Sequence, residues 1–331
     1  MRSYLPSEHP IPVVHQLLLS GVAPRPIALV SSLDTEGRNN LSPFSYYNAF
    51  GANPPVITIS PAFRAGNGIP KHTFLNILET REFTVSAVSY AMVEQVSLAS
   101  SDYERGVDEF VKAGFTKRAS SIVAPPGVAE SPFVMECRLL HHIDTGGKPG
   151  AGNLLVAEVV MFHVKESSFE NDKMDPRRLD LVSRMGHAWY CRANGDALFE
   201  LPKPRHNGIG IDALPLHMRD SSVFTGNDLG RFAGSASVPD AEKIRGEWKR
   251  DISRLGISSN EADMFEAELR MDSLRSALLI IFRCISDGDS ETMILSRLQR
   301  LAQAFLRAGD VERAWACALM SAPEELAFLR R

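Results

Sequence analysis

The sequence predicts a mainly β domain with added helices, followed by a small α-helical C-terminal region. Residues 24–60 place apolar and β-branched residues between turn residues, a pattern typical of short strands. Residues 131–143 and 153–164 have the pattern of two long antiparallel strands joined by a glycine-rich loop. After residue 205, apolar residues recur at helical spacing and the long strand patterns stop.

The composition is that of an ordinary soluble globular protein. The chain has 331 residues, 44% hydrophobic and 23% charged, which is enough for one large domain or two of ordinary size. A net charge of -4 gives no reason to expect a nucleic-acid partner. The start of the chain has no signal-peptide pattern, and the apolar run 277–282 is far too short to cross a bilayer. We therefore expect a cytoplasmic protein without a nucleic-acid or membrane partner.

The N-terminal residues predict a short helix leading into strands. Residues 13–19 follow two prolines and are apolar enough for a short helix. Within 24–60, the turns are too short for parallel crossovers, so three short strands in an antiparallel meander are expected.

A glycine-bearing loop at residues 63–68 precedes a predicted helix at 71–78. His72 or Thr73 lies near the start of this helix, where free backbone N–H groups and the helix dipole favour an anion. The helix start is therefore a candidate phosphate subsite. The alternative is that Thr73 only caps the helix.

The middle of the chain predicts a strand at 82–89 and helical pieces at 90–100 and 102–113. The glycine-rich loop at 144–152 lacks the G-x-G-x-x-G order, and strands flank it on both sides, so it is read as a hairpin loop.

Metal binding is not expected in either part of the chain. Adjacent His141 and His142 point to opposite faces of a strand, which disfavours chelation of one ion. The four cysteines are scattered without a CxxC pair, which disfavours both a structural zinc site and a disulfide framework.

The C-terminal region predicts a separate helical domain. Helices are expected at 242–255, 261–285, 291–308 and 310–329, which gives a split of the chain into domains 1–205 and 206–331. Just before the boundary, Arg184 is followed by Gly186 and two aromatic residues. This segment suits either a cover for a planar ligand or a packed terminal turn of the barrel.

Several common catalytic motifs are missing from the sequence. It contains no P-loop, no HExxH, no G-x-S-x-G and no Rossmann fingerprint. No catalytic side chain is identified, and any activity is expected to draw on a bound organic cofactor that carries the chemistry.

An ordered set of segments resembles one known family. The segments are PRPIALVSS (24–32), N-x-SPFSYYNAF (40–50), NPPVITIS (53–60), KHTFLNILETREFTVSAVS (71–89), AESPFVMEC (129–137), LLVAEVVMFHV (154–164) and SRMGHAWY (183–190). Together they resemble the flavin reductase-like family, whose members have the FMN-binding split-barrel fold. The resemblance covers residues 20–200 and does not extend to the helical region.

The resemblance implies a homodimer with FMN near the subunit interface. The family often has Lys-Asp-Thr where this chain has Lys71-His72-Thr73. A histidine in place of the acid is expected to favour a nearby phosphate. The residues expected to bind FMN are Arg25, Ser42, Ser45, Asn48, Ser60, Arg64, Lys71, His72, Thr73 and Asn76. Among them, Arg25, Arg64 and Lys71 are the cations expected to pair with the phosphate, and Asn48 suits the heteroatom edge of the flavin ring.

The function this implies is that of an FMN-dependent oxidoreductase, with NADH or NADPH as the electron donor and free flavin, a partner oxygenase or another molecule as the acceptor. Two alternatives remain open. The helical region could cover the flavin in an oxidase or monooxygenase that acts on a small organic substrate. The protein could also be a non-catalytic flavin-binding or scaffold protein.

Overall fold

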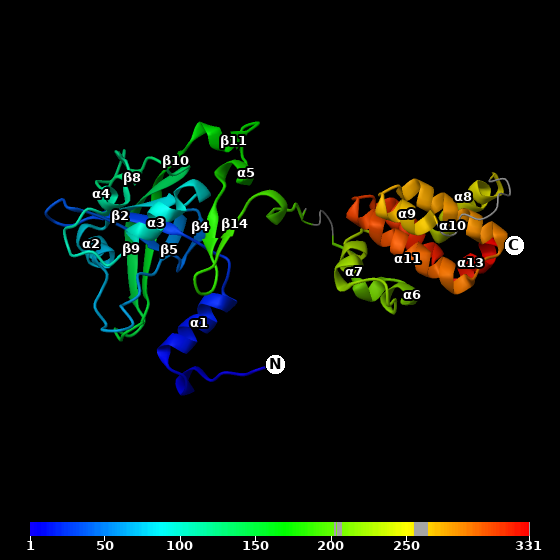
Figure 1. Ribbon diagram of the computed structural model, residues 1–331, viewed down its shortest axis with the longest axis horizontal. Coiled ribbons are helices and arrows are strands. Elements are labelled where there is room, and N and C mark those ends of the chain that lie inside the picture. The colour runs from blue at the N-terminus through cyan, green and yellow to red at the C-terminus, as the bar shows by residue number, and fades with distance from the viewer. Residues whose placement is uncertain (202, 204–206, 255–263, 331) are drawn as a thin grey trace. The chain divides into compact units, whose positions relative to one another are not determined.

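A computed structural model describes residues 1–201, 203, 207–254 and 264–330 of the chain (Figure 1). The chain forms two compact units, Met1–Glu200 and Leu201–Arg331. The first unit contains the strands and the second contains helices. The predicted domain boundary at residues 205 and 206 lies outside the described residues.

The first unit is built on a seven-stranded antiparallel sheet with the strand order β3-β2-β6-β9-β10-β5-β4. Its strands are β2 (Ala28–Leu33), β3 (Asn39–Phe44), β4 (Tyr47–Ala52), β5 (Pro55–Ile59), β6 (Glu82–Ala87), β9 (Phe133–Asp144) and β10 (Asn153–Val164). The long strands predicted at 131–143 and 153–164 are confirmed as β9 and β10, and the strand predicted at 82–89 as β6.

The predicted three-stranded meander over residues 24–60 is wrong. This stretch supplies two hairpins, β2–β3 and β4–β5, which lie at opposite edges of the sheet because β6, β9 and β10 pair between them. Only residues 45 and 46 separate β3 from β4. The two edges of the sheet must therefore lie close together, which curls the sheet into an open barrel.

Three smaller sheets complete the strands. β1 (Arg25–Pro26) pairs with β13 (Val182–Arg184), which pairs with β14 (Tyr190–Arg192). The segment that suited either a cover for a planar ligand or a packed terminal turn is therefore a hairpin paired with β1. The other two sheets are the hairpins β7 (Lys117–Arg118) with β8 (Gly127–Val128), and β11 (Phe169–Glu170) with β12 (Lys173–Met174).

The barrel unit also contains α-helices and 3₁₀ turns. They are α1 (Ile11–Gly21), α2 (His72–Thr80), α3 (Val93–Ala99), α4 (Glu109–Ala113) and α5 (Pro176–Leu179), with 3₁₀ turns at Pro6–Glu8, Tyr90–Met92, Glu166–Ser168 and Gly195–Ala197. The helices predicted at 13–19, 71–78 and 90–100 are found. The helix predicted from residue 102 starts only at Glu109, because the Asp108 carboxylate caps the N–H of Phe110 and ends the loop there.

The two faces of the sheet carry separate apolar clusters. Alternate residues of β2 divide between them: Val30 packs with Phe74 and Ile77 of α2, whereas Leu29 packs with α3 and α4. This period-two division is what the β pattern of the sequence requires.

Helices are the only regular secondary structure in the described part of the second unit. Its helices are α6 (Leu216–Arg219), α7 (Gly226–Ala233), α8 (Ala241–Arg254), α9 (Phe265–Arg270), α10 (Leu274–Asp287), α11 (Glu291–Arg307), α12 (Val311–Met320) and α13 (Pro323–Leu329), with a 3₁₀ turn at Ile211–Ala213. They enclose their own core, which includes Phe232, Phe282 and Trp315. No helix in the described ranges is both long and apolar enough to span a membrane.

Two of the predicted C-terminal helices are each divided into two helices in the structure. The prediction for 310–329 is broken before Pro323, whose ring and missing N–H disfavour continuation of α12 into α13. In the prediction for 261–285, residues 261–263 lie outside the described part, and α9 and α10 are separated at Asp272, which has a positive φ of 55°.

Candidate functional site

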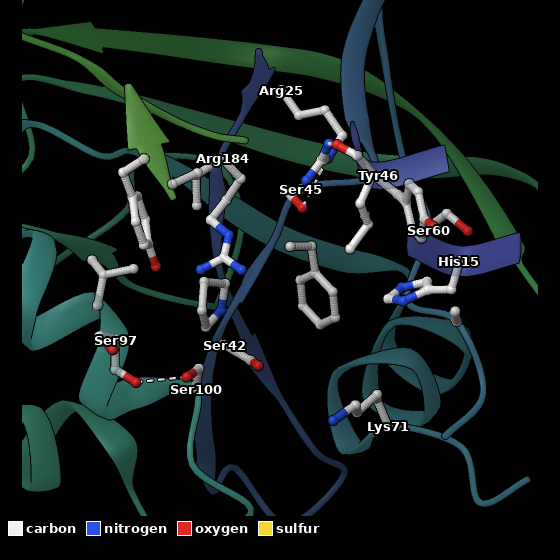
Figure 2. Close-up of a pocket in the computed structure, with 17 residues that line it drawn as sticks. His15, Arg25, Ser42, Ser45, Tyr46, Ser60, Lys71, Ser97, Ser100 and Arg184 are labelled. Carbon is white, nitrogen blue, oxygen red and sulfur yellow. Dashed lines mark hydrogen bonds between the residues drawn. The ribbon is translucent and has the colours of Figure 1, made fainter. Parts of the chain in front are cut away.

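One pocket of about 370 Å³ lies where the first strands, α1, α3, the β13–β14 hairpin and Lys71 at the start of α2 meet (Figure 2). Its polar lining combines hydroxyl groups with cationic side chains, and Phe44, Tyr46 and Tyr190 add aromatic surface. Its volume falls in the range of about 300–1,000 Å³ typical of sites for small organic ligands.

A second chamber of about 1030 Å³ adjoins this pocket. Both are lined by His15, Tyr46, Ala62 and Lys71, so they share a wall. The second chamber is bounded by α1, by the glycine-bearing loop at 63–67 and by the β9–β10 loop at 148–151. The glycine-rich hairpin loop at 144–152 thus also borders the second chamber.

The structure brings six of the ten predicted FMN residues to these two cavities. Ser42, Ser45, Ser60, Arg25 and Lys71 line the first pocket, and Arg64 and Lys71 line the second chamber. The other four line neither cavity. Asn48 is exposed on the edge strand β4 and accepts the N–H of Ala49, whereas His72, Thr73 and Asn76 lie in α2.

Arg25 is held by protein carbonyls. It is only 4% exposed. Its guanidinium donates to the carbonyl oxygens of Leu19 and Val22 at the end of α1, to Met185 O at 3.0 Å, and to Ser45 Oγ at 3.4 Å. Four donated bonds leave this guanidinium little capacity for a phosphate. In this structure Arg25 fastens α1 and the β13–β14 hairpin to the wall of the pocket.

Thr73 does not cap α2, because the N-cap is Lys71, which makes no side-chain capping bond. Instead, Thr73 Oγ1 donates to Asn40 Oδ1 at 2.5 Å. Asn40 in turn donates to Glu109 at 3.0 Å, and the same carboxylate accepts the N–H of Leu41 at 2.9 Å. This buried network fixes the start of α2 against β3, and so sets the spacing between Lys71 and the serines of the pocket.

Arg64 and Lys71 form the cationic pair of the site. Both face one carboxylate oxygen of Asp102, at 2.8 Å for Arg64 Nη2 and 3.5 Å for Lys71 Nζ. Two buried polar atoms nearby have no hydrogen-bond partner among the described residues: Nε of Arg64 and Oδ1 of Asn76. Buried polar groups are normally paired, so the free Arg64 donor is an observation that fits a ligand.

His72 does not add positive charge to this pair at neutral pH. Burial lowers the pKa of His72, and the neighbouring Arg64 and Arg105 charges lower it further. The expected benefit of a histidine in place of an acid is therefore the removal of a negative charge.

The predicted set of binding residues omitted several that line the pocket. His15 and Leu19 reach it from α1, Ser97 and Ser100 from α3, and Tyr46 from the segment between β3 and β4. His15 and Leu19 are four residues apart on a helix, and Ser97 and Ser100 are three apart. The residues of each pair therefore face the same side. This spacing is the sequence feature that could have identified them as pocket residues.

Arg184 and Tyr190 line the pocket from β13 and β14. The Arg184 guanidinium lies 4.6 Å from the centre of the Tyr190 ring and donates to His187 O. The structure shows this segment as a paired hairpin. Its Arg184 (Figure 2) and its Tyr190 both line the pocket, which agrees with the reading of a cover for a planar ligand.

Sequence comparison relates the barrel unit to known proteins. The profile of the flavin reductase-like domain matches residues 20–182. An uncharacterized protein of Halalkalibacterium halodurans is 38% identical over 192 residues, which covers 57% of this chain and 90% of that protein. The uncharacterized protein YwrF of Bacillus subtilis is 32% identical over 161 residues, covering 48% of this chain and 78% of YwrF.

Solved structures show the same relationship. Nitrilotriacetate monooxygenase component B from Bacillus cereus is 33% identical with a TM-score of 0.57, over 61% of this chain and 98% of that one. The 2-nitrobenzoate 2-nitroreductase of Pseudomonas fluorescens is 28% identical with a TM-score of 0.53, over 61% and 96% respectively. The predicted split-barrel fold with a helical C-terminal region is thereby confirmed. The chain belongs to the flavin reductase-like family, whose domain occupies residues 20–182.

Proposed function

We propose that the protein is an FMN-dependent oxidoreductase of the flavin reductase type, which uses NADH or NADPH as the electron donor. Membership of the family and similarity to a nitroreductase and a monooxygenase component support flavin-linked redox chemistry. The observation that carries the proposal is a single pocket in the family domain that combines hydroxyl groups, aromatic rings and an adjoining cationic pair.

The residues present fit the phosphate end of FMN. Arg64 and Lys71 are partly buried, with 25% and 34% of their side chains exposed, and face the same point. Arginine and lysine beside each other bind phosphate through charge-assisted hydrogen bonds, and the free Nε of Arg64 supplies a further donor. Of the three cations predicted for the phosphate, these two are the ones whose placement supports the role.

The first pocket suits the ribityl chain and the ring. The hydroxyls of Ser42, Ser45 and Ser60 can exchange hydrogen bonds with a polyol chain. Tyr46 and Tyr190 offer flat apolar surface for an aromatic ring system, and Arg184 adds a cationic donor near the ring. When bound, FMN would supply the hydride-accepting and electron-donating group that these side chains do not contain.

The chain's own contribution is to hold and orient the cofactor. The Glu109–Asn40–Thr73 network fixes the start of α2, and the four bonds from Arg25 fix the opposite wall. Rigid placement of the reacting groups is a main way in which a protein accelerates transfer between two bound molecules.

The second chamber contains the cations that we assign to the flavin phosphate. Tyr46, which we assign to the ring, lies on the wall that it shares with the first pocket, and this wall is our candidate for the place where donor and acceptor approach. The chamber is large enough for a second ligand. The similar Bacillus cereus protein is one component of a monooxygenase. This supports a partner oxygenase as the acceptor of electrons or of reduced flavin.

We further propose that the protein is a homodimer with FMN near the interface. The helix α1 projects from the barrel unit (Figure 1). None of its residues is buried, although it carries apolar side chains such as Leu17 and Leu18. Phe50, on the edge strand β4, is 69% exposed. Exposed apolar surface of this kind is typical of an interface, and the family resemblance points to a second copy of the chain as the partner.

The test uses the full chain purified from a host that makes flavin. We expect a yellow protein with FMN released on denaturation, and anaerobic oxidation of NADH or NADPH by the loaded protein. Light scattering should give the mass of a dimer. A protein that neither takes up FMN nor oxidises either nucleotide would refute the proposed function. Tight FMN binding without turnover would instead favour the non-catalytic alternative.

A further inference from the structure

Asp102 lies in the loop between α3 and α4 and contacts the cations that we assign to the flavin phosphate. One of its oxygens is 2.8 Å from Arg64 and 3.5 Å from Lys71, and its side chain is 61% exposed. It lines the second chamber together with both cations. An acidic side chain therefore occupies the point where the two positive charges converge.

The groups in direct ion-pair contact at this point carry a small net charge. Arg64 and Lys71 contribute two positive charges, Asp102 removes one, and His72 is kept uncharged at neutral pH because its pKa is lowered by burial and by neighbouring cations. A phosphate dianion that binds both cations must displace the carboxylate or bind beside it. In the first case two ion pairs are lost, and in the second case like charges repel.

We propose that Asp102 is an affinity-determining residue of the flavin site, which competes with the ligand phosphate for Arg64 and Lys71. This inference rests on the proposed function. The exposed carboxylate can turn into solvent once its two ion pairs are broken, whereas the cations are partly buried. Asp102 thus weakens the binding of a phosphorylated flavin selectively and leaves the contacts of the ring and ribityl chain unchanged. Such a site would release FMN more readily, which suits delivery of reduced flavin to a second protein.

The experiment compares FMN with riboflavin, which lacks the phosphate, on the full-length wild type and on Asp102→Asn. Exposed ion pairs each contribute about 0.2–1 kcal/mol, a factor of about 1.5–5 in affinity. Loss of two such pairs and of the repulsion should tighten FMN binding about tenfold and leave riboflavin binding unchanged. The gain should fall as salt rises, since salt screens exposed charges. Glu104→Gln, at an exposed carboxylate two residues away, is the charge-matched control.

A second comparison separates competition from a structural effect. In an Arg64→Gln background, Asp102→Asn should raise FMN affinity by clearly less than tenfold, because one of the contested cations is gone. Weaker or unchanged FMN binding in Asp102→Asn would overturn the inference and assign Asp102 to orienting the cations. An equal gain for riboflavin, or for Glu104→Gln, would also overturn it. In all these cases the wild type still binds FMN, so the proposed function stands. Failure of the wild type to bind FMN would refute both.

Discussion

Replacement of Glu136 by glutamine should destabilise the barrel unit in a pH-dependent way. Glu136 on β9 is fully buried and accepts the N–H groups of Ser121 and Ile122 at 2.6 Å and of Val123 at 2.9 Å. It also contacts His163 Nε2 at 2.6 Å. Because Arg118 can only donate to Nδ1 of His163, the histidine proton lies on Nε2 and points at the carboxylate.

The magnitude follows from the pKa of this carboxylate. Burial alone would raise the pKa of Glu136, but three N–H groups and His163 lower it from 4.5 to about 2. A difference of about 2.5 pKa units corresponds to roughly 3 kcal/mol. Since the folded pKa is the lower one, this stability is fully present above about pH 4.5 and is lost as the pH falls toward 2. Glutamine never carries the charge, so Glu136→Gln should lose about 3 kcal/mol at pH 7.

The two units need not unfold together, so the assay must report on the barrel unit alone. Hydrogen exchange of β9 peptides measures global opening of this unit, and exchange at residues 121–123 measures local release of the loop. Glu166→Gln, at an exposed glutamate, is the matched control. The gap between wild type and Glu136→Gln should shrink between pH 4.5 and pH 3. A gap below about 1 kcal/mol at pH 7, or one that is independent of pH, would refute the reasoning.

Three further predictions concern the rest of the chain. Arg25→Lys should lose the hydrogen bond to Met185 and some of those to the end of α1, which should lower the free energy of unfolding by about 1–3 kcal/mol. Faster hydrogen exchange in α1 and weaker FMN binding would show this, and unchanged exchange would contradict the assigned role. Ile281→Ala, at a fully buried position of α10, should destabilise the helical unit by about 2–5 kcal/mol without changing FMN affinity. A chain ending at Glu200 should keep nicotinamide oxidation if the protein is a simple reductase, whereas its loss from a folded fragment would favour the oxidase or monooxygenase alternative.

Local patterns predicted β6, β9 and β10, because alternation and turn residues act over short stretches, but they gave three strands in residues 24–60, where the structure has five. The alternating residues of β10 predict a strand and no other element. Turn residues before β2 and between β4 and β5 predict where these strands begin and end. The pairing of the strands was not predictable in the same way. That β3 and β4 occupy opposite edges depends on β6, β9 and β10, which lie far along the chain.

The roles of individual side chains were the least predictable part, and the reason is again sequence distance. Arg25 has the positive charge and the place in the sequence expected of a residue that binds phosphate. Met185, 160 residues later, instead supplies one of the carbonyl oxygens to which its guanidinium donates. Thr73 has the residue type of a helix cap, but its hydroxyl donates to Asn40 on another element. A residue type fixes what a side chain can bind, and the fold decides which partner it meets.

The role of Asp102 also depends on the fold, but here the fold adds a residue to the site that the sequence did not predict. In the sequence Asp102 belongs to a stretch predicted as helix, where an acidic residue would be one more solvated charge. The later start of α4 leaves it in a loop, and that loop carries it to Arg64 and Lys71. Asp102 in this loop lowers the summed charge of the Arg64–Lys71–Asp102 group from two to one. If that difference controls how tightly FMN is held, the α3–α4 loop is the element through which relatives of this protein could adjust flavin retention without altering the pocket itself.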